Sequence, residues 1–191
     1  MNRRKAIGRI LLTGTGAAAL LAGNEWYDTG KRPELSYLDR HETLLAALAE
    51  TIIPATDTPG ARDAGVQHFI IKMVKEATEK KSQNKFINGL RDLKLYCLQK
   101  YGKPYQDCAV AEQEAVLGHF ERKGRPLGGI AGKIQTRILG QPFFTTLKTY
   151  TITGYCTSRE GATQGLAYLP VPGRYDACTP LKPGQKAWAT N

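Results

Sequence analysis

The fold is decided by the stretch SYLDRHETLLAALAETIIPATDTPGARDAGV, residues 36–66. Up to residue 53 its apolar residues recur at steps of three and four, which predicts a helix with one apolar face. They are Leu38, Leu44, Leu45, Leu48, Ile52 and Ile53. Pro54 ends this helix, because proline lacks an amide hydrogen and disfavours a helical residue before it. Thr, Asp and the pair Pro59-Gly60 then form a turn, and a second helix starts near residue 66. The stretch predicts two helices joined by a turn of fixed geometry.

Further segments with helical periodicity follow this turn, and none shows the alternation of a strand. The ranges that we expect to be helical are 66–80, 83–101, 111–123, 134–139 and a stretch that begins at 142 and stops at Gly161. From residue 162 the chain is rich in glycine and proline but also carries apolar side chains. The sequence therefore predicts an all-α fold, a single helical bundle with an irregular C-terminal arm.

The length of 191 residues suits one domain. We divide the chain into an N-terminal signal or anchor at residues 1–23, a linker at 24–35 and the helical domain at 36–191. The formal net charge is +10, but four of the basic residues lie within the first nine positions. The remaining basic residues alternate with acids along the helices. We find neither a basic stripe nor a known nucleic-acid-binding module, so the charge does not indicate nucleic-acid binding.

The first 23 residues have the layout of an export signal. MNRRKAIGR is a charged start that contains Arg3 and Arg4, and the apolar run ILLTGTGAAALLA follows it. This run is shorter than the ~20 apolar residues that a spanning helix needs. The arginine pair favours a twin-arginine signal, although Ala6 stands where such signals prefer a large apolar residue. An ordinary secretion signal and an uncleaved anchor are the alternatives, and we expect a periplasmic protein.

Four cysteines fit an exported chain, in which disulfides persist. They allow three pairings. Cys97 and Cys108 enclose a short loop between two helical segments, which favours their pairing. Cys156 and Cys178 either pair with each other or leave one thiol for a partner chain. The spacing of the cysteines supports neither a zinc site nor a haem attachment site.

The search for catalytic groups yields only structural interpretations. His41, His68 and His119 fall on separate helical segments, and no serine stands in a nucleophile elbow. Capping and turn roles explain the acids near residues 39–63, where Asp57 or Thr58 is expected to bond backbone donors of the turn. The glycine-rich stretch GRPLGGIAGK follows no strand and lacks the spacing of a phosphate-binding loop. Aromatic residues crowd the second half of the chain, which fits core packing and a partner-facing patch alike.

Two long blocks carry a resemblance. They are LLAALAETIIPATDTPGARDAGV (44–66) and FFTTLKTYTITGYCTSREGATQGLAYLPVPGRYDAC (143–178). Through them the chain resembles the gluconate 2-dehydrogenase subunit 3 family, over nearly all of its length after the signal. The resemblance implies a small exported subunit without catalytic, cofactor-binding or metal-binding residues of its own. Its large partner would be an FAD-dependent flavoprotein of the glucose–methanol–choline type. Such a partner would oxidise CH–OH groups of sugars or sugar acids, as gluconate 2-dehydrogenases and glucoside 3-dehydrogenases do.

The resemblance also implies further partners and a surface. A cytochrome c often accepts the electrons, and the small subunit's twin-arginine signal lets the leaderless flavoprotein cross the membrane through the export machinery. We expect the turn, the aromatic helix and the arm to bind the large subunit. The expected partner-binding residues are Pro54, Thr56, Asp57, Pro59, Gly60, Phe143, Phe144, Tyr155, Tyr168, Pro172, Gly173 and Tyr175. Cys156 departs from the aromatic residue usual at its position in the family, which leaves Cys178 available for a bridge to the large subunit.

Two other functions compete with this interpretation. A stand-alone periplasmic enzyme would need convergent polar groups, which the residue spacing does not reveal. A membrane-tethered periplasmic scaffold would use residues 10–22 as its anchor. The sequence identifies neither the sugar nor the oxidised carbon, because those belong to the partner.

Overall fold

The computed structural model describes residues 31–125, 128–129, 133, 136–137, 139–169, 171, 173, 178, 180 and 183–189. The predicted signal residues Arg3 and Arg4 lie outside this part of the chain, as do Pro172 and Tyr175 of the predicted partner surface. The described residues form helices and an irregular C-terminal segment, and they contain no strand. The all-α prediction is confirmed.

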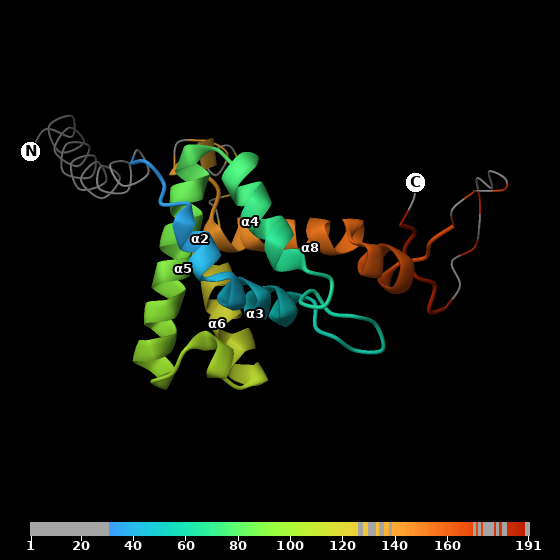
Figure 1. Ribbon diagram of the computed structural model, residues 1–191, viewed down its shortest axis with the longest axis horizontal. Helices are drawn as coiled ribbons and strands as arrows, with labels where there is room; N and C mark the ends of the chain where they lie inside the picture. The colour runs from blue at the N-terminus through green and yellow to red at the C-terminus, as the bar shows by residue number, and fades with distance from the viewer. Residues whose placement is uncertain are drawn as a thin grey trace, which may run out of the picture.

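The helices follow the predicted order along the chain (Figure 1). They are α2 (Ser36–Arg40), α3 (Glu42–Ile52), α4 (Val66–Glu76), α5 (Lys80–Tyr101), the 3₁₀ turn η1 (Tyr105–Asp107), α6 (Val110–Lys123), α8 (Phe143–Thr157) and the π-helical turn η2 (Gly161–Gly165). Helix α3 ends at Ile52, with Ile53 as its C-cap, just before Pro54. Of the short helix expected at 134–139, residues 136, 137 and 139 are described and helical, and the other three lie outside the described part.

The helix predicted over residues 36–53 is interrupted at His41. In a continuous helix the amide of His41 would bond to the carbonyl of Tyr37, four residues back. Here the amide bonds to Leu38 O at 3.1 Å. The imidazole Nδ1 of His41 takes over the carbonyl of Tyr37 at 2.9 Å, and the two rings stack. The side chain of His41 thus satisfies the group that the break exposes, which periodicity alone could not reveal.

The boundary between α4 and α5 also differs from the prediction. Helix α4 ends at Glu76 and α5 begins at Lys80, three residues earlier than expected. The buried Gln83 explains the end of α4, because its side-chain nitrogen donates to Val74 O at 2.9 Å and to Lys75 O at 3.0 Å. These carbonyls lack helical partners at the end of α4. Gln83 thereby caps one helix from within the first turns of the next.

Helix α8 is the central element of the bundle. It contacts α3, α4, α5, α6 and η2, and Figure 1 shows it running across the direction of α5. Phe143, at its first position, is buried and packs against Phe86 of α5 at 5.3 Å and Phe120 of α6 at 6.0 Å between ring centroids. Further along, Leu147 and Thr151 are completely buried. The core of the protein is therefore organised around this helix.

Two glycines let α8 approach its neighbours closely. A Cβ atom on Gly89 of α5 would lie 2.3 Å from Cγ of Phe143, well inside van der Waals contact. A Cβ atom on Gly154 of α8 would lie 2.8 Å from Cδ1 of Phe69 on α4. The rings of Phe143 and Phe69 occupy the space that a larger residue would need. These contacts set the distances of α8 from α5 and α4.

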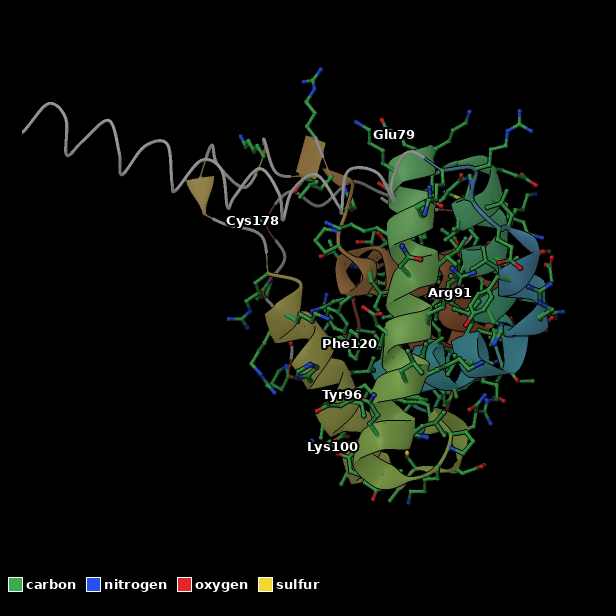
Figure 2. The ribbon with its side chains drawn as sticks, turned by 90° about the vertical axis from the view of Figure 1, so that its left-hand side faces the viewer. Glu79, Arg91, Tyr96, Lys100, Phe120 and Cys178 are labelled. Atoms are coloured by element: carbon green, nitrogen blue, oxygen red, sulfur yellow. The ribbon has the colours of Figure 1, made fainter. Side chains whose placement is uncertain are left out.

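Helix α5 forms the long edge of the bundle. Figure 2 shows it upright, from Glu79 at its start to Lys100 near its end, with Phe120 of α6 beside it. Tyr96 of α5 stacks on His119 at 4.4 Å and meets Phe120 edge-on at 5.9 Å. These rings hold α6 against the second half of α5. Within the described residues, none of the helices has the length and apolar character to cross a membrane.

We predict opposite effects for alanine at two helical glycines. Glycine inside a helix normally costs about 1 kcal/mol relative to alanine. Gly118→Ala in α6 should therefore stabilise the protein by up to about 1 kcal/mol, since its Cβ would meet only the flexible end of Arg122, at 3.4 Å. Gly89→Ala should destabilise it by about 1–3 kcal/mol, because the Phe143 ring must move. Denaturant unfolding measures both, and equal effects at the two sites would contradict the proposed contact.

Candidate docking surface

The turn after α3, residues 54–60, is held by the carboxylate of Glu50. Oε1 accepts the amide of Ala55 at 2.9 Å, and Oε2 accepts the amide of Arg62 at 2.9 Å. One side chain from the last turns of α3 thereby fixes both ends of the loop. The sequence favoured Asp57 or Thr58 for this role. That detail was wrong for Asp57, whose carboxylate accepts the hydroxyl of its neighbour Thr56 at 2.9 Å.

Gly60 allows this arrangement because it has no side chain. A Cβ atom at this position would lie 2.5 Å from both carboxylate oxygens of Glu50 and 2.6 Å from the amide nitrogen of Ala55. Even the smallest side chain would therefore displace the carboxylate from the loop. The Pro59-Gly60 pair, which looks like an ordinary turn dipeptide in the sequence, is required by the approach of Glu50.

Tyr155 joins the 54–60 loop to the end of α8. Its ring is buried, and its hydroxyl donates to Pro59 O at 2.9 Å. On its other side the hydroxyl packs against Gly165 of η2, where a Cβ atom would lie 2.6 Å from the Tyr155 oxygen. The loop and the π-helical turn therefore meet on the two sides of one tyrosine. A π-helical turn frequently marks a functional site.

The C-terminal arm, residues 166–189, leaves the bundle after η2. Its two ends are joined by a parallel bridge in which Ala167 N donates to Ala187 O and Ala189 N donates to Ala167 O, both at 2.8 Å. Figure 1 shows the arm extending from the end of α8, away from α5 and on the same side as the 54–60 loop. The arm carries four of the eight large apolar side chains that are exposed among the described residues. They are Tyr168, Leu169, Val171 and Trp188.

The predicted partner-binding residues divide by exposure. Those that are exposed are Pro54, Thr56, Asp57, Tyr168 and Gly173. Those that are half-buried are Pro59 and Phe144, and those that are buried are Gly60, Phe143 and Tyr155. Through Tyr155 and Gly165, the structure places the turn and the start of the arm at the same end of α8, and it places Phe143 in the core at the opposite end. Buried residues of this set support the surface, and contact of the exposed ones with a partner stays a prediction.

The sequence analysis missed Trp188, counted Val171 only among the apolar side chains of the arm, and correctly gave Glu50 a role in the turn without identifying its partners. Trp188 is 54% exposed in the arm, and Val171 is 76% exposed. Neither side chain belongs to a periodic pattern, so only their apolar character in a glycine- and proline-rich segment could have indicated them. Glu50 was assigned to capping and turn roles, although its link to residues 55 and 62 depends on a loop whose path the sequence does not give. We call residues 54–60 together with the arm the docking surface.

All four cysteines are free thiols in the structure. Cys97 and Cys108 are both buried at the junction of α5, η1 and α6. Burial, and next the neighbouring Cys108 thiol, raise the pKa of Cys97 to about 11. Burial also raises the pKa of Cys108. At neutral pH both thiols are therefore protonated and poor nucleophiles, which argues against a catalytic role. Cys156 is half-buried on α8, and Cys178 is exposed on the arm, so both remain candidates for the second pairing.

Other titratable groups take part in structural networks. The buried Tyr105 donates its hydroxyl to Thr51 Oγ1 at 2.8 Å, and Gln113 donates to Tyr105 O at 3.0 Å, which links α3, η1 and α6. Burial raises the pKa of Tyr105, against the opposing effect of the hydrogen bond to Thr51. His68 lies 3.5 Å from Glu42 on the surface. Among the described residues, no three His, Cys, Asp or Glu side chains gather as metal ligands.

One protein-family model matches most of the chain. The family model described as gluconate 2-dehydrogenase subunit 3 matches residues 39–173, which include the 54–60 loop, α8 and the base of the arm. The chain belongs to the gluconate 2-dehydrogenase subunit 3 family. Its relatives are subunits of multi-subunit dehydrogenases, so the family supports a catalytic partner subunit. No curated protein and no solved structure matches the chain.

Replacing Gly60 should disrupt the loop. In Gly60→Ala the new methyl group displaces the Glu50 carboxylate from the amides of Ala55 and Arg62, and hydrogen bonds to a charged group contribute about 1.5–3 kcal/mol. We expect a loss of about 1–3 kcal/mol in the free energy of unfolding, measured by denaturant titration. Thr56→Ala in the same loop is the control and should stay within about 0.5 kcal/mol of the wild type. An unchanged Gly60→Ala protein would contradict the role of Glu50.

The predicted pairing of Cys97 with Cys108 can be tested on protein isolated from its own host without reductant. Both thiols are free and buried at one helix junction, and the Cys108 thiol influences the pKa of Cys97, so the two lie near each other. Peptide mapping by mass spectrometry, with alkylation of free thiols in denaturant and no reductant, should find the two peptides linked. Recovery of both cysteines in alkylated form would contradict the predicted disulfide.

Proposed function

We propose that this protein is the non-catalytic small subunit of a periplasmic, FAD-dependent dehydrogenase of sugars or sugar acids. It supports the folding and stability of a large flavoprotein subunit and escorts that subunit through twin-arginine export. The observation that carries the proposal is the exposed apolar arm beside a rigid loop, in a chain of this family. Exposed apolar surface of this kind marks an interaction site in a soluble protein.

The chemistry of the docking surface suits a protein partner. Trp and Tyr are enriched at the centres of interfaces, and the arm presents Trp188 and Tyr168 on its exposed surface. The neighbouring 54–60 loop adds Thr and Asp side chains, which suit a polar rim. Because Glu50 and Tyr155 already hold the loop, little conformational entropy is lost when a partner binds. The polar loop and the apolar side chains of the arm thus contribute different chemistry to one interface.

The export role follows from the N-terminal sequence together with this surface. The twin-arginine route carries folded proteins, so a leaderless flavoprotein can cross only if it is already bound to a subunit that has a signal. Docking would therefore take place before export, with FAD in the large subunit. A cytochrome c is the expected electron acceptor of the assembled enzyme. The arginine pair Arg3-Arg4 supplies the signal in this scheme.

Native purification tests the proposal. The full chain, tagged at its C-terminus and expressed in its own host, is isolated from the periplasm without denaturant, and the absorption spectrum of the product is recorded. We expect a large partner subunit with flavin absorbance and dehydrogenase activity toward a sugar or sugar acid. Recovery of the chain alone, without a chromophore, would overturn the proposal and favour a stand-alone enzyme or a scaffold.

Substitutions in the arm should separate partner binding from folding. Trp188→Ser and Tyr168→Ser remove exposed aromatic rings, and a buried aromatic residue at an interface contributes about 2 kcal/mol or more. Each variant should therefore bind the large subunit at least about tenfold more weakly in a quantitative pull-down, with an unchanged melting temperature. Leu95→Ser, at a 57% exposed leucine on α5, is the matched control. Equal binding by the arm variants and the control would contradict the docking surface.

A further inference from the structure

The fold gathers basic side chains at the start of α5. The backbone carbonyl of Lys31 accepts a hydrogen bond from Asn84 Nδ2 at 2.7 Å, which places residues 31–32 beside the first turns of this helix. Three lysines of α5 lie within about one helical turn of Asn84. We call the resulting group the basic cluster, which consists of Lys31, Arg32, Lys80, Lys81 and Lys85. Because it joins two segments that are distant along the chain, the sequence shows no basic stripe.

The basic cluster is accessible and only weakly compensated by acids. Each of its members is exposed or half-buried. Among the ion pairs of the described residues, none involves Arg32 or the three lysines of α5. Glu34, which belongs to the same segment as Arg32, is bound to Arg40 and Arg91. With Glu79 as the adjacent acid at the N-cap of α5, the cluster keeps a net positive charge.

Local electrostatics do not favour this placement of the lysines. The N-terminus of a helix carries a partial positive charge, so acidic side chains are preferred in its first turn. The first turn of α5 contains no acid and begins with Lys80 and Lys81. Lys85 follows Lys81 by four residues, so two like charges are neighbours on the helix surface. Residues that break local rules without a compensating contact in their own chain indicate a role outside it.

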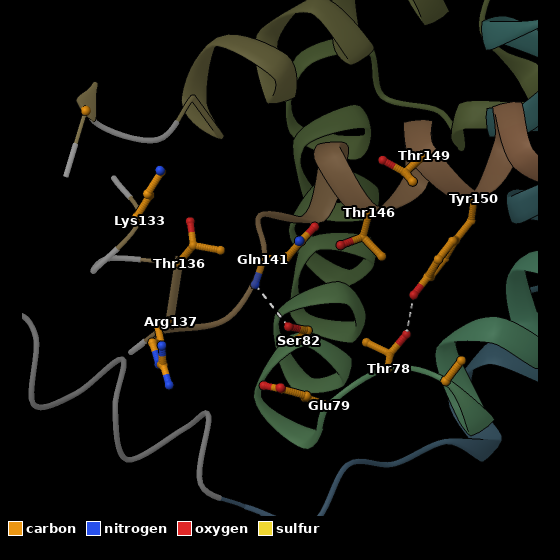
Figure 3. A pocket seen from close by; sticks show the side chains of 12 residues that line it. Thr78, Glu79, Ser82, Lys133, Thr136, Arg137, Gln141, Thr146, Thr149 and Tyr150 are labelled. Atoms are coloured by element: carbon orange, nitrogen blue, oxygen red, sulfur yellow. Dashed lines mark hydrogen bonds between the residues drawn. The ribbon is translucent and has the colours of Figure 1, made fainter. Parts of the chain in front are cut away.

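Positive charge continues around the same turn of the helix. A cavity of about 710 Å³ borders it, lined by Glu79 and Ser82 on this side and by residues of α8 on another (Figure 3). The exposed Lys133 and Arg137 also line the cavity, and Figure 3 shows their side chains pointing in different directions. Since these two cations do not converge, they indicate a broad positive surface and not a pocket for a single anion.

The N-terminal sequence indicates what kind of surface lies opposite the basic cluster. The apolar run of residues 10–22, which we expect to enter a membrane as an export signal or as an anchor, ends nine residues before Lys31. An extended chain covers at most ~3.6 Å per residue, so the cluster stays within about 30 Å of the end of that run. Whenever the run is in a bilayer, the cluster is therefore close to lipid headgroups.

We propose that the basic cluster binds the anionic surface of a lipid bilayer, with the phosphate groups of acidic lipids as its ligands. Basic segments next to a membrane-inserted stretch bind acidic headgroups through an attraction that extends over about 10 Å at 0.1 M salt. The contact turns the start of α5 toward the membrane. It leaves the arm, which extends away from α5 in Figure 1, accessible to the large subunit. The proposal rests on the N-terminal sequence and the cluster, and it does not require the escort function.

Flotation of the full chain with lipid vesicles tests the proposal without the large subunit. The vesicles contain either phosphatidylcholine alone, which is neutral, or phosphatidylcholine with phosphatidylglycerol, which is anionic. Lys80→Gln/Lys85→Gln should weaken binding to the anionic vesicles about tenfold at 0.1 M salt, because each basic residue near the surface adds to the attraction. Lys100→Gln/Lys103→Gln removes the same charge at the other end of α5 and should bind like the wild type.

The orientation of the bundle is measured separately, because the N-terminal segment can itself hold the chain on a vesicle. Amide NMR spectra of the wild-type full chain are recorded on nanodiscs that contain phosphatidylglycerol, with and without a gadolinium-chelating lipid. The gadolinium broadens the signals of amides near the headgroups. We expect the strongest broadening for Arg32, Lys81 and Lys85, and retained signals for Lys100 and for Thr56 in the 54–60 loop.

Three results would overturn the proposal. They are equal binding of the two double variants to anionic vesicles, equal affinity of the wild type for neutral and anionic vesicles, and broadening that is uniform or centred away from the basic cluster. The second would leave an acidic protein surface as the partner of the cluster. The NMR measurement needs no variant, so it decides the question even if a substitution impairs folding. None of these results bears on whether the large subunit binds to the arm.

Discussion

The close seating of α8 against α5 and α4 is the constraint on which the other features depend. Gly89 admits the Phe143 ring at one end of the helix, and Gly154 admits the Phe69 ring near the other. Because α8 is fixed at both ends, its intermediate residues Leu147 and Thr151 are fully buried among the surrounding helices. A helix held in this way can position groups at its C-terminal end with little freedom. The small residues in α5 and α8 are thus as important to the architecture as the aromatic ones.

The C-terminal end of α8 supports the docking surface. The Tyr155 hydroxyl bonds the Pro59 carbonyl on one side and packs against Gly165 on the other, so the loop and the base of the arm share one buried support. From there the chain turns outward and exposes Tyr168 and Trp188. The protein therefore combines a polar loop held by hydrogen bonds with an arm whose described residues expose large apolar side chains. This combination suits the proposed binding of a large partner subunit.

The sequence predicted the helix order and the stop at Pro54 because both depend on local patterns, namely apolar periodicity and the missing proline amide. It failed where a side chain replaces or restrains backbone hydrogen bonds. The break at His41 depends on an imidazole that replaces a backbone hydrogen bond, and the need for Gly60 arises from Glu50, ten residues earlier. Family resemblance located the turn and the arm but could not separate the buried Phe143 and Tyr155 from residues that face solvent. The cavity beside α8 gave no sequence signal, because its lining comes from distant segments.

The most direct test of the docking surface is hydrogen–deuterium exchange measured by mass spectrometry on the full chain, alone and in the purified complex with its large subunit. Our account predicts slower exchange in the complex for peptides that contain the 54–60 loop and the described arm residues around Tyr168 and Trp188. It predicts unchanged exchange around Leu95 on the outer face of α5. Protection confined to α5 and α6, with an arm that exchanges equally in both states, would contradict it.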